Sequence, residues 1–189
     1  PEKTNYIPHA VPEDLCKRLP DDTCRQLRRR LLGPEREEHF IALYVSRNAR
    51  RKMPSDIMLS WKMFLDDLEK REGHRNATLV MHTDPRDPEG PNLITVLESL
   101  GLQEHVVFSK DRVDFGGINN IYNIADVIVN RSCNEGFGLS VLEGKMAERP
   151  VIALKTGGLG RQVEDYIDGT QYGVALEPEV QCLVGNQGV

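Results

Sequence analysis

Two glutamates bracket a glycine-bearing turn in the second half of the chain: Glu135 and Glu143, with Gly136 and Gly138 between them. Glycines at a strand-to-helix turn let backbone N–H groups approach a bound anion, and the helix dipole favours negative charge there. Carboxylates do not bind phosphate, but they accept hydrogen bonds from hydroxyl groups. The turn therefore suits a ligand that carries phosphate at its centre and hydroxyls at its edges, such as a nucleotide sugar.

The two carboxylates also allow other interpretations. A pair of carboxylates is the acid/base machinery of glycoside hydrolysis, but with Glu135 on a loop and Glu143 on a helix they need not face each other. We expect Glu143 near the helix N-terminus, where the dipole stabilises the anion, so that it is a poor proton donor and a good acceptor. The spacing alone is equally compatible with two surface glutamates.

Arg47 and Lys52 directly follow an apolar run, residues 39–46. A guanidinium and an ammonium together can neutralise a diphosphate, although a solvated basic turn would use the same residues. No G-x-G-x-x-G follows the run, which argues against a nicotinamide dehydrogenase. His82 and His105 have no partner histidine at ligand spacing, so we expect them to line the cleft or the core and not to hold a metal.

The elements that must position these residues alternate along the chain. Apolar runs predict six strands, and helical spacing predicts the segments between them. The strands are expected at 39–46, 77–82, 105–109, 126–129, 150–154 and 172–176, and the helices at 12–32 in two pieces, 54–71, about 93–100, 118–124, 139–149 and 158–167. This order predicts a Rossmann-like α/β domain of three layers with a mostly parallel sheet, whose ligand binds beyond the carboxyl ends of the strands.

Size and composition fit one globular domain. The 189 residues are 39% apolar and 28% charged, and the net charge of −5 argues weakly against a nucleic-acid partner. The four cysteines, Cys16, Cys24, Cys133 and Cys182, form no C-x-x-C pair, which favours free thiols in a reducing, cytoplasmic setting. No apolar run reaches the ~18 residues of a membrane span. The first residue is Pro1, so we expect a fragment of a longer protein.

The segment Glu135-Gly-Phe-Gly-Leu-Ser-Val-Leu-Glu143 resembles the E-x7-E motif of a known family, the retaining glycosyltransferases of the two-domain GT-B architecture (group 1, family 4). The resemblance extends to Ile124-Ala-Asp-Val-Ile-Val before the motif, and to Pro150-Val-Ile-Ala and Gly157-Gly158 after it. Arg47 and Lys52 match the paired basic residues of that family, and Tyr6-Ile-Pro-His-Ala-Val11 is similar to its linker strand.

The resemblance implies a role for each candidate residue. Catalysis would rest on Arg47, Lys52 and Glu135, with the two cations in place of a metal on the leaving diphosphate. The backbone N–H groups of Leu139 and Ser140 would help to hold the diphosphate. The transferred sugar would lie against Glu135 and the backbone of Gly136, Phe137 and Gly138, and Glu143 would accept from the ribose hydroxyls. No cofactor or metal would be needed, and the anomeric configuration would be retained.

The resemblance also predicts the domain organisation. Residues 1–11 would be a linker strand from a missing N-terminal domain that binds the acceptor, and residues 12–189 a donor-binding domain truncated at its C-terminal end. The whole protein would transfer a hexosyl group from a nucleoside-diphosphate sugar to an acceptor that the sequence does not identify, and the fragment alone would be inactive. Two alternatives stay open: a nucleotide-sugar epimerase on the same scaffold, and a non-catalytic nucleotide-sugar or protein-binding module.

Overall fold

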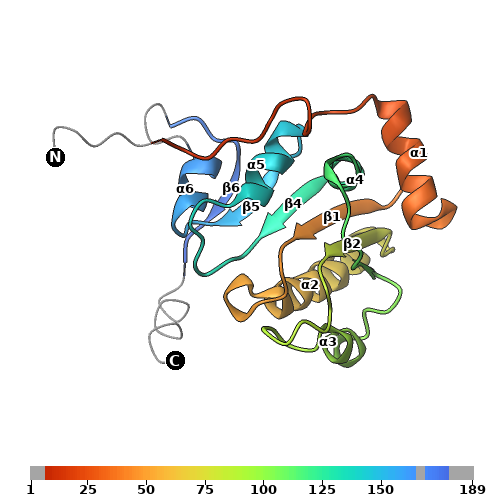
Figure 1. Cartoon of the computed structure of the whole chain (residues 1–189). Helices are drawn as coiled ribbons and strands as arrows, with labels where there is room; N and C mark the ends of the chain where they lie inside the picture. The colour runs from red at the N-terminus through yellow and green to blue at the C-terminus, as the bar shows by residue number, and fades with distance from the viewer. Residues whose placement is uncertain (1–6, 165–168, 179–189) are drawn as a thin grey trace.

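A computed structural model describes residues 7–164 and 169–178 of the chain. Its sheet has six strands in the order β3-β2-β1-β4-β5-β6 (Figure 1). The strands are β1 (Phe40–Val45), β2 (Ala77–His82), β3 (Val106–Ser109), β4 (Val127–Asn130), β5 (Val151–Leu154) and β6 (Gly173–Leu176). Every pair of neighbouring strands in this sheet is parallel. The predicted α/β fold is confirmed, with a sheet that is wholly parallel over the described residues.

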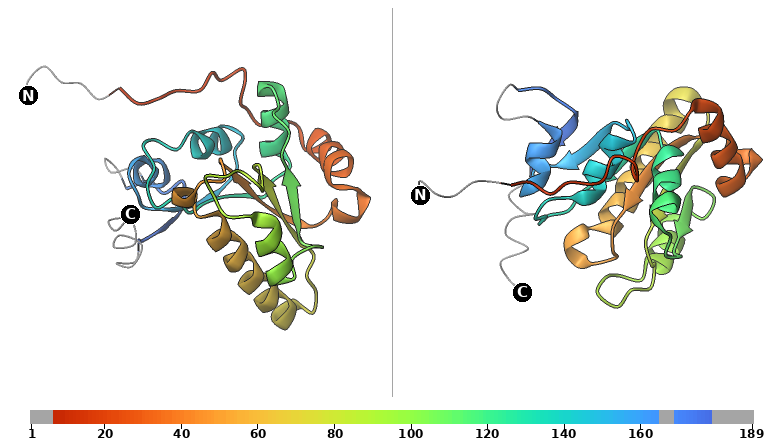
Figure 2. Two further views of the ribbon diagram at one scale, coloured as in Figure 1. Left: turned by 60° about the horizontal axis from the view of Figure 1, so that its bottom comes forward. Right: turned by 45° about the horizontal axis from the view of Figure 1, so that its top comes forward.

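Helices cover the sheet in two layers (Figure 2). One layer holds α1 (Asp21–Leu32), α4 (Phe115–Asn123), α5 (Leu139–Met146) and α6 (Gly158–Val163), and the other holds α2 (Pro54–Glu72) and α3 (Leu93–Leu100). Two short 3-10 helices, η1 (Pro34–Arg36) and η2 (Arg50–Lys52), flank β1. The predicted three-layer arrangement is therefore confirmed.

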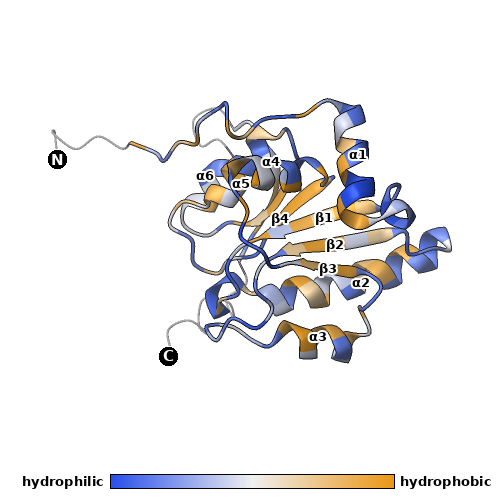
Figure 3. Ribbon diagram, turned by 45° about the vertical axis from the view of Figure 1, so that its right-hand side comes forward, coloured by the Kyte–Doolittle hydropathy of each residue, from blue (hydrophilic) through white to orange (hydrophobic). Residues whose placement is uncertain are grey.

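Strand β1 shows why the strands are continuously apolar. Ile41 and Leu43 belong to the core beneath the first helical layer, while Ala42 and Tyr44 belong to the core beneath the second. Since side chains alternate between the two faces of a strand, a strand buried on both faces must be apolar at every position. The hydropathy colouring shows this apolar sheet between the helices (Figure 3).

The first predicted helical piece is wrong, because residues 12–19 form one turn and then an irregular segment. After the turn, the backbone groups of Lys17 and Leu19 bond to asparagine side chains of α4 and do not continue a helix. Asn119 Oδ1 accepts from the Lys17 N–H at 3.0 Å, and Asn123 Oδ1 accepts from the Leu19 N–H at 2.8 Å. The Asn123 amide in turn donates to the Lys17 carbonyl at 2.8 Å. Partners about a hundred residues away thus replace a local helix.

The ends of two other helices differ by a few residues from their predicted positions. Helix α4 starts three residues before the predicted position, because the Asp114 side chain caps it by accepting from the Gly117 N–H at 2.7 Å. Helix α6 ends at Val163, and Glu164 forms an antiparallel bridge with Gln171. Residues 165–168 lie outside the described part. In the predicted linker strand, residues 1–6 also lie outside it, and residues 7–11 have no regular secondary structure.

The strand order places a reversal between β1 and β4. After β1 the chain moves outward through β2 to β3, and it then returns to pair β4 on the other side of β1. In open parallel sheets this switch point opens a crevice beyond the carboxyl ends of the two strands. Within the described residues, no helix is both long enough and apolar enough to cross a membrane.

Candidate functional site

A cavity of about 390 Å³ lies at the carboxyl end of β1, where the reversal predicts it. It is lined by His9, Val45, Ser46, Lys52, Glu135, Phe137, Gly138, Leu139 and Ser140. Six of these are residues that the sequence nominated, brought together from two loops 83 positions apart. The candidate site is therefore an assembly of the turn after β1 and the turn after β4.

Lys52 and Glu135 form an ion pair inside this cavity. Lys52 ends η2, and its ammonium donates to Glu135 Oε2. Both side chains are largely buried, and the Arg51 guanidinium lies 3.9 Å from the same carboxylate oxygen. Further bonds join the two loops: the Arg51 carbonyl accepts from the Cys133 N–H at 2.9 Å, and the Arg51 guanidinium donates to the Asn134 carbonyl at 2.9 Å. The site thus holds a cation and an anion side by side.

The loop that carries Glu135 rests closely on the loop after β5. The Gly158 N–H donates to the Glu135 carbonyl at 3.1 Å. Gly157 has a φ of +51°, and a Cβ placed there would lie 2.0 Å from the same carbonyl oxygen. Only glycine allows this approach without a shift of the backbone. The Gly157-Gly158 pair therefore packs against the backbone of the loop that carries Glu135. It does not line the cavity.

Helix α5 begins at the cavity. Val141 and Leu142 donate their backbone N–H groups to the Gly138 carbonyl, at 3.0 and 3.3 Å. Leu139 and Ser140 line the cavity, and their N–H groups are among those that a helix start leaves without an intrahelical acceptor. An anion in the cavity would meet these groups together with the positive end of the helix dipole.

Arg47 lies on the other side of the end of β1. Its Nε and Nη2 donate to the two carboxylate oxygens of Asp87, at 2.6 and 3.1 Å, and this guanidinium lowers the pKa of Asp87. Arg47 lines a second cavity, of about 270 Å³, which shares Val45 and Ser46 with the first. The second cavity also holds His82, Thr83, Ser109 and Lys110. The two predicted cations thus face neighbouring cavities.

Glu143 departs from what its helix position predicted. Its Oε2 accepts from the Tyr122 hydroxyl at 2.6 Å, and it does not line the first cavity. Burial raises the pKa of Glu143, although the Tyr122 hydrogen bond opposes the shift. Burial thus acts against the stabilisation of the anion expected from the helix dipole, which is strongest within the first turn, whereas Glu143 is the fifth residue of α5.

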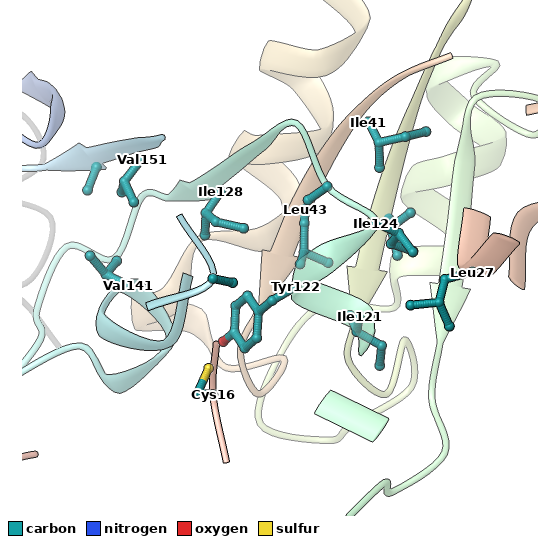
Figure 4. Packing of buried hydrophobic residues seen from close by; sticks show 14 of the residues in the cluster. Cys16, Leu27, Ile41, Leu43, Ile121, Tyr122, Ile124, Ile128, Val141 and Val151 are labelled. Carbon is teal, nitrogen blue, oxygen red and sulfur yellow. The ribbon is translucent and has the colours of Figure 1, made fainter. Parts of the chain in front are cut away.

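Cys16 and the hydroxyl end of Tyr122 lie side by side in the core next to Glu143 (Figure 4). Tyr122 is fully buried, and the Cys16 thiol donates to the Glu143 carbonyl at 3.2 Å. Burial, and then the nearby Glu143, raise the pKa of Cys16 to about 11. All three groups consequently hold their protons more tightly than they would in water.

The sequence missed Gln162 and His9. Gln162 lies on α6 and its amide donates to the carbonyls of Phe137 and Gly138, at 2.6 and 3.1 Å. The sequence offered one indication of its role: Gln162 is polar but lies at helical spacing from the apolar residue Leu159 and next to Val163. The His9 ring meets the Phe137 ring edge-on, with centroids 5.2 Å apart. Gly136, which the resemblance nominated, is exposed and is absent from the cavity lining.

The remaining polar groups fit structural roles. His82 Nδ1 pairs with the Ser109 hydroxyl at 3.0 Å, and burial lowers the pKa of His82. His105 Nδ1 lies 3.2 Å from the Ala77 carbonyl. Across the described residues, no group of three or more His, Cys, Asp or Glu is arranged to hold a metal ion. Cys16, Cys24 and Cys133 are free thiols, while Cys182 lies outside the described part.

Comparison with known proteins places the chain in a family. The family described as glycosyl transferases group 1 matches residues 32–179. Among curated relatives, the D-inositol 3-phosphate glycosyltransferases of Actinosynnema mirum and Geodermatophilus obscurus are 29% and 32% identical. Each match covers 89% of this chain but only 39% and 36% of the relative. The chain therefore spans less than two fifths of the length of these two relatives.

Solved structures share the fold. The Anabaena protein HepE, solved in complex with UDP-glucose, superposes with a TM-score of 0.67 at 21% identity, over 94% of this chain and 44% of HepE. WaaG, a glycosyltransferase involved in lipopolysaccharide biosynthesis, gives a TM-score of 0.72 at 19% identity, over 99% of this chain and 46% of WaaG. Both likenesses show the same α/β architecture, which in such proteins forms one half of a GT-B fold.

Proposed function

Since this chain belongs to the glycosyl transferases group 1 family, we propose that it is the donor-binding half of an enzyme that transfers a hexosyl group from a nucleoside-diphosphate sugar, with retention of configuration. One observation carries the proposal. Lys52, Glu135 and the start of α5 converge on a single cavity at the switch point of the sheet. A cation, helix N–H groups and a hydroxyl acceptor in one cavity match the parts of a nucleotide sugar.

The diphosphate would lie between the two cavities. Lys52 and the N–H groups of Leu139 and Ser140 would meet it from one side, and Arg47 from the other. A bound diphosphate competes with Glu135 for Lys52 and with Asp87 for Arg47, because each carboxylate already occupies its cation. When the donor binds, Lys52 and Arg47 would each exchange a carboxylate partner for the diphosphate.

The same groups suit the chemistry of transfer. When the bond between the anomeric carbon and the diphosphate breaks, negative charge develops on the leaving diphosphate. Lys52, Arg47 and the helix N-terminus would stabilise that charge, as preorganised dipoles do in other enzymes. We propose that these cations make a metal unnecessary. Glu135, freed from Lys52, would accept hydrogen bonds from the sugar hydroxyls through its carboxylate.

The nucleoside end of the donor would reach Glu143 and the second cavity. Glu143 accepts from Tyr122 through Oε2, which leaves Oε1 for a ribose hydroxyl. The base would enter the second cavity, between the ends of β1, β2 and β3. The acceptor, its site, and the cytoplasmic location expected from the sequence stay predictions for the whole protein.

Isothermal titration with UDP, GDP, ADP and their sugars tests the proposal. We expect at least one of them to bind, and Lys52→Met to weaken that binding by about 10- to 100-fold, because a charge-assisted contact contributes ~1.5–3 kcal/mol. Lys70→Met, on the exposed face of α2, is the matched control and should bind as wild type. If no nucleotide or nucleotide sugar gives a measurable heat of binding, the proposal is wrong.

Transfer itself needs the full-length protein. Incubating it with a labelled donor, with and without candidate acceptors, separates a transferase from a sugar epimerase. A transferase consumes the donor in an acceptor-dependent way and yields an α product from an α donor. An isomerised sugar formed without an acceptor would contradict the proposed reaction.

A further inference from the structure

Gln162 is a buried polar residue of α6 that shares its inward face with apolar side chains. It is 6% exposed, and Leu159 and Val163 of the same helix belong to the core. Its amide nitrogen bonds to two consecutive carbonyls of the loop that precedes α5, those of Phe137 and Gly138. Its amide oxygen is buried and has no hydrogen-bond partner among the described residues. Such a half-satisfied amide weakens the fold, so its presence calls for another explanation.

The geometry of the peptide bond provides one. In a trans peptide the carbonyl of one residue and the N–H of the next point in opposite directions. Gln162 holds the Phe137 carbonyl toward α6, which turns the Gly138 N–H away from that helix. It also bonds to the Gly138 carbonyl, which accepts from the Val141 and Leu142 N–H groups as well, so Gln162 and the start of α5 together orient the Leu139 N–H. Gly138 and Leu139 line the cavity that contains Lys52.

A second contact acts in the same direction. The Glu135 carbonyl accepts from the Gly158 N–H at the start of α6, so the Gly136 N–H also points away from that helix. Gly138 has a φ of +90°, and a Cβ there would lie 2.4 Å from the Leu159 side chain, so the loop lies directly on α6. Helix α6 therefore donates hydrogen bonds to the carbonyl groups of the loop before α5.

We propose that Gln162 is a positioning residue for donor binding: through the Phe137 and Gly138 carbonyls it helps to orient the Leu139 N–H, one of the two N–H groups assigned to the diphosphate, together with the adjacent Gly138 N–H. This inference rests on the proposed function, since it names what orients the anion-binding groups of that site. Gln162 does not touch the donor. Its effect passes through the loop backbone, and it concerns the phosphate part of the ligand and not the nucleoside part.

The variant Gln162→Met tests this directly, because methionine has a similar length and fills the same space but donates no hydrogen bond. We expect the dissociation constant for the nucleotide that binds wild type to rise about tenfold, the loss of roughly one charge-assisted contact. We expect the same factor with inorganic pyrophosphate as the probe, because the N–H groups meet phosphate in both ligands. If Gln162→Met folds poorly by circular dichroism, Gln162→Leu provides the same measurement.

Val163→Ala is the matched control. Val163 is the next residue on α6 and is 1% exposed, so its truncation lowers the denaturation midpoint without removing a bond to the loop. We expect its nucleotide affinity to equal that of wild type at a temperature well below its unfolding midpoint. A loss of affinity in Val163→Ala as large as that in Gln162→Met would show that general loosening of α6 is the cause, and would overturn the inference.

The outcomes separate the two proposals. If wild type binds a nucleotide and Gln162→Met binds it equally well, the positioning role is wrong and the proposed function stands. A loss seen with the nucleotide but not with pyrophosphate would also overturn it. If wild type binds neither nucleotides nor pyrophosphate, the proposed function fails, and the inference fails with it.

Discussion

Glu135 and Glu143 are the same residue type in one motif, but they have different surroundings. Glu135 pairs with a cation, Lys52, at the mouth of a cavity, whereas Glu143 accepts from a buried hydroxyl, Tyr122. Burial without a cation disfavours the ionised form of the Glu143 carboxyl group and raises its pKa. The two glutamates therefore suit different tasks, which their shared motif does not reveal.

A pH-dependent stability follows from Glu143. Because burial raises its pKa above the ordinary value of 4.5, the folded chain binds this proton more tightly than the unfolded chain. The free energy of unfolding contributed by this group therefore falls as the pH rises from about 4.5 through the raised pKa. Glutamine cannot ionise, so Glu143→Gln should gain stability relative to wild type across that window.

Urea denaturation at several pH values between 4 and 7.5 measures this difference. Glu98→Gln, at an exposed position on α3, serves as the control and should follow the wild-type curve. Parallel curves for Glu143→Gln and wild type would show that burial of Glu143 does not control its protonation.

At the scale of elements, the site depends on two loops that touch backbone to backbone. The loop before α5 and the loop before α6 meet at Gly157, where a side chain has no room. Helix α5 supplies the N–H groups, α6 supplies Gln162, and η2 supplies Lys52. A parallel sheet brings these loops together because the carboxyl ends of all its strands lie on the same side.

Gly157→Ala should therefore damage both stability and ligand binding. The added Cβ would lie 2.0 Å from the Glu135 carbonyl oxygen, so the loop must move, and the positive φ adds strain. We expect a loss of ~1–3 kcal/mol in the free energy of unfolding and a clear loss of nucleotide affinity. Denaturation and titration calorimetry measure the two effects.

Gly73→Ala is the control for backbone strain alone. Gly73 also has a positive φ, of +76°, but a Cβ there meets nothing within 4 Å. This variant should lose some stability and keep its nucleotide affinity. Equal affinities for Gly157→Ala and Gly73→Ala would mean that the approach of the two loops is unimportant for binding.

At the scale of the whole molecule, one sheet separates two cores. Strand β1 contributes Ile41 and Leu43 to one core and Ala42 and Tyr44 to the other. Trp61, the only tryptophan of the chain, lies in the second core. Because β1 belongs to both cores, we expect a substitution that destabilises one core to lower the unfolding midpoint of the other as well.

Leu43→Ala tests this coupling. Leu43 is fully buried in the core opposite to Trp61, and its truncation should cost ~2–5 kcal/mol. We expect Trp61 fluorescence and far-UV circular dichroism to report one shifted transition, as in two-state unfolding. A Trp61 transition that stays at the wild-type midpoint while the circular dichroism shifts would show that the two cores unfold separately.

The sequence by itself determined the architecture and the main site loops. Buried parallel strands must be apolar at every position, and Pro54 begins a helix because its ring suits the first helical turn, so these features are visible in short windows. The motif between Glu135 and Glu143 and its resemblance to a known family pointed to the same cavity that the strand order opens. Local pattern and global topology agreed here.

Only the tertiary structure decided which side chains pair. The backbone of Lys17 and Leu19 bonds to two asparagines of α4, Arg47 bonds to Asp87, and Gln162 bonds to the loop before α5. No short window of the sequence contains both partners of any of these bonds. The same holds for Glu143, whose pKa is raised by burial beneath groups from distant parts of the chain. Hydrogen bonds and desolvation depend on what lies within a few ångströms in space, and folding brings those groups together from distant parts of the chain.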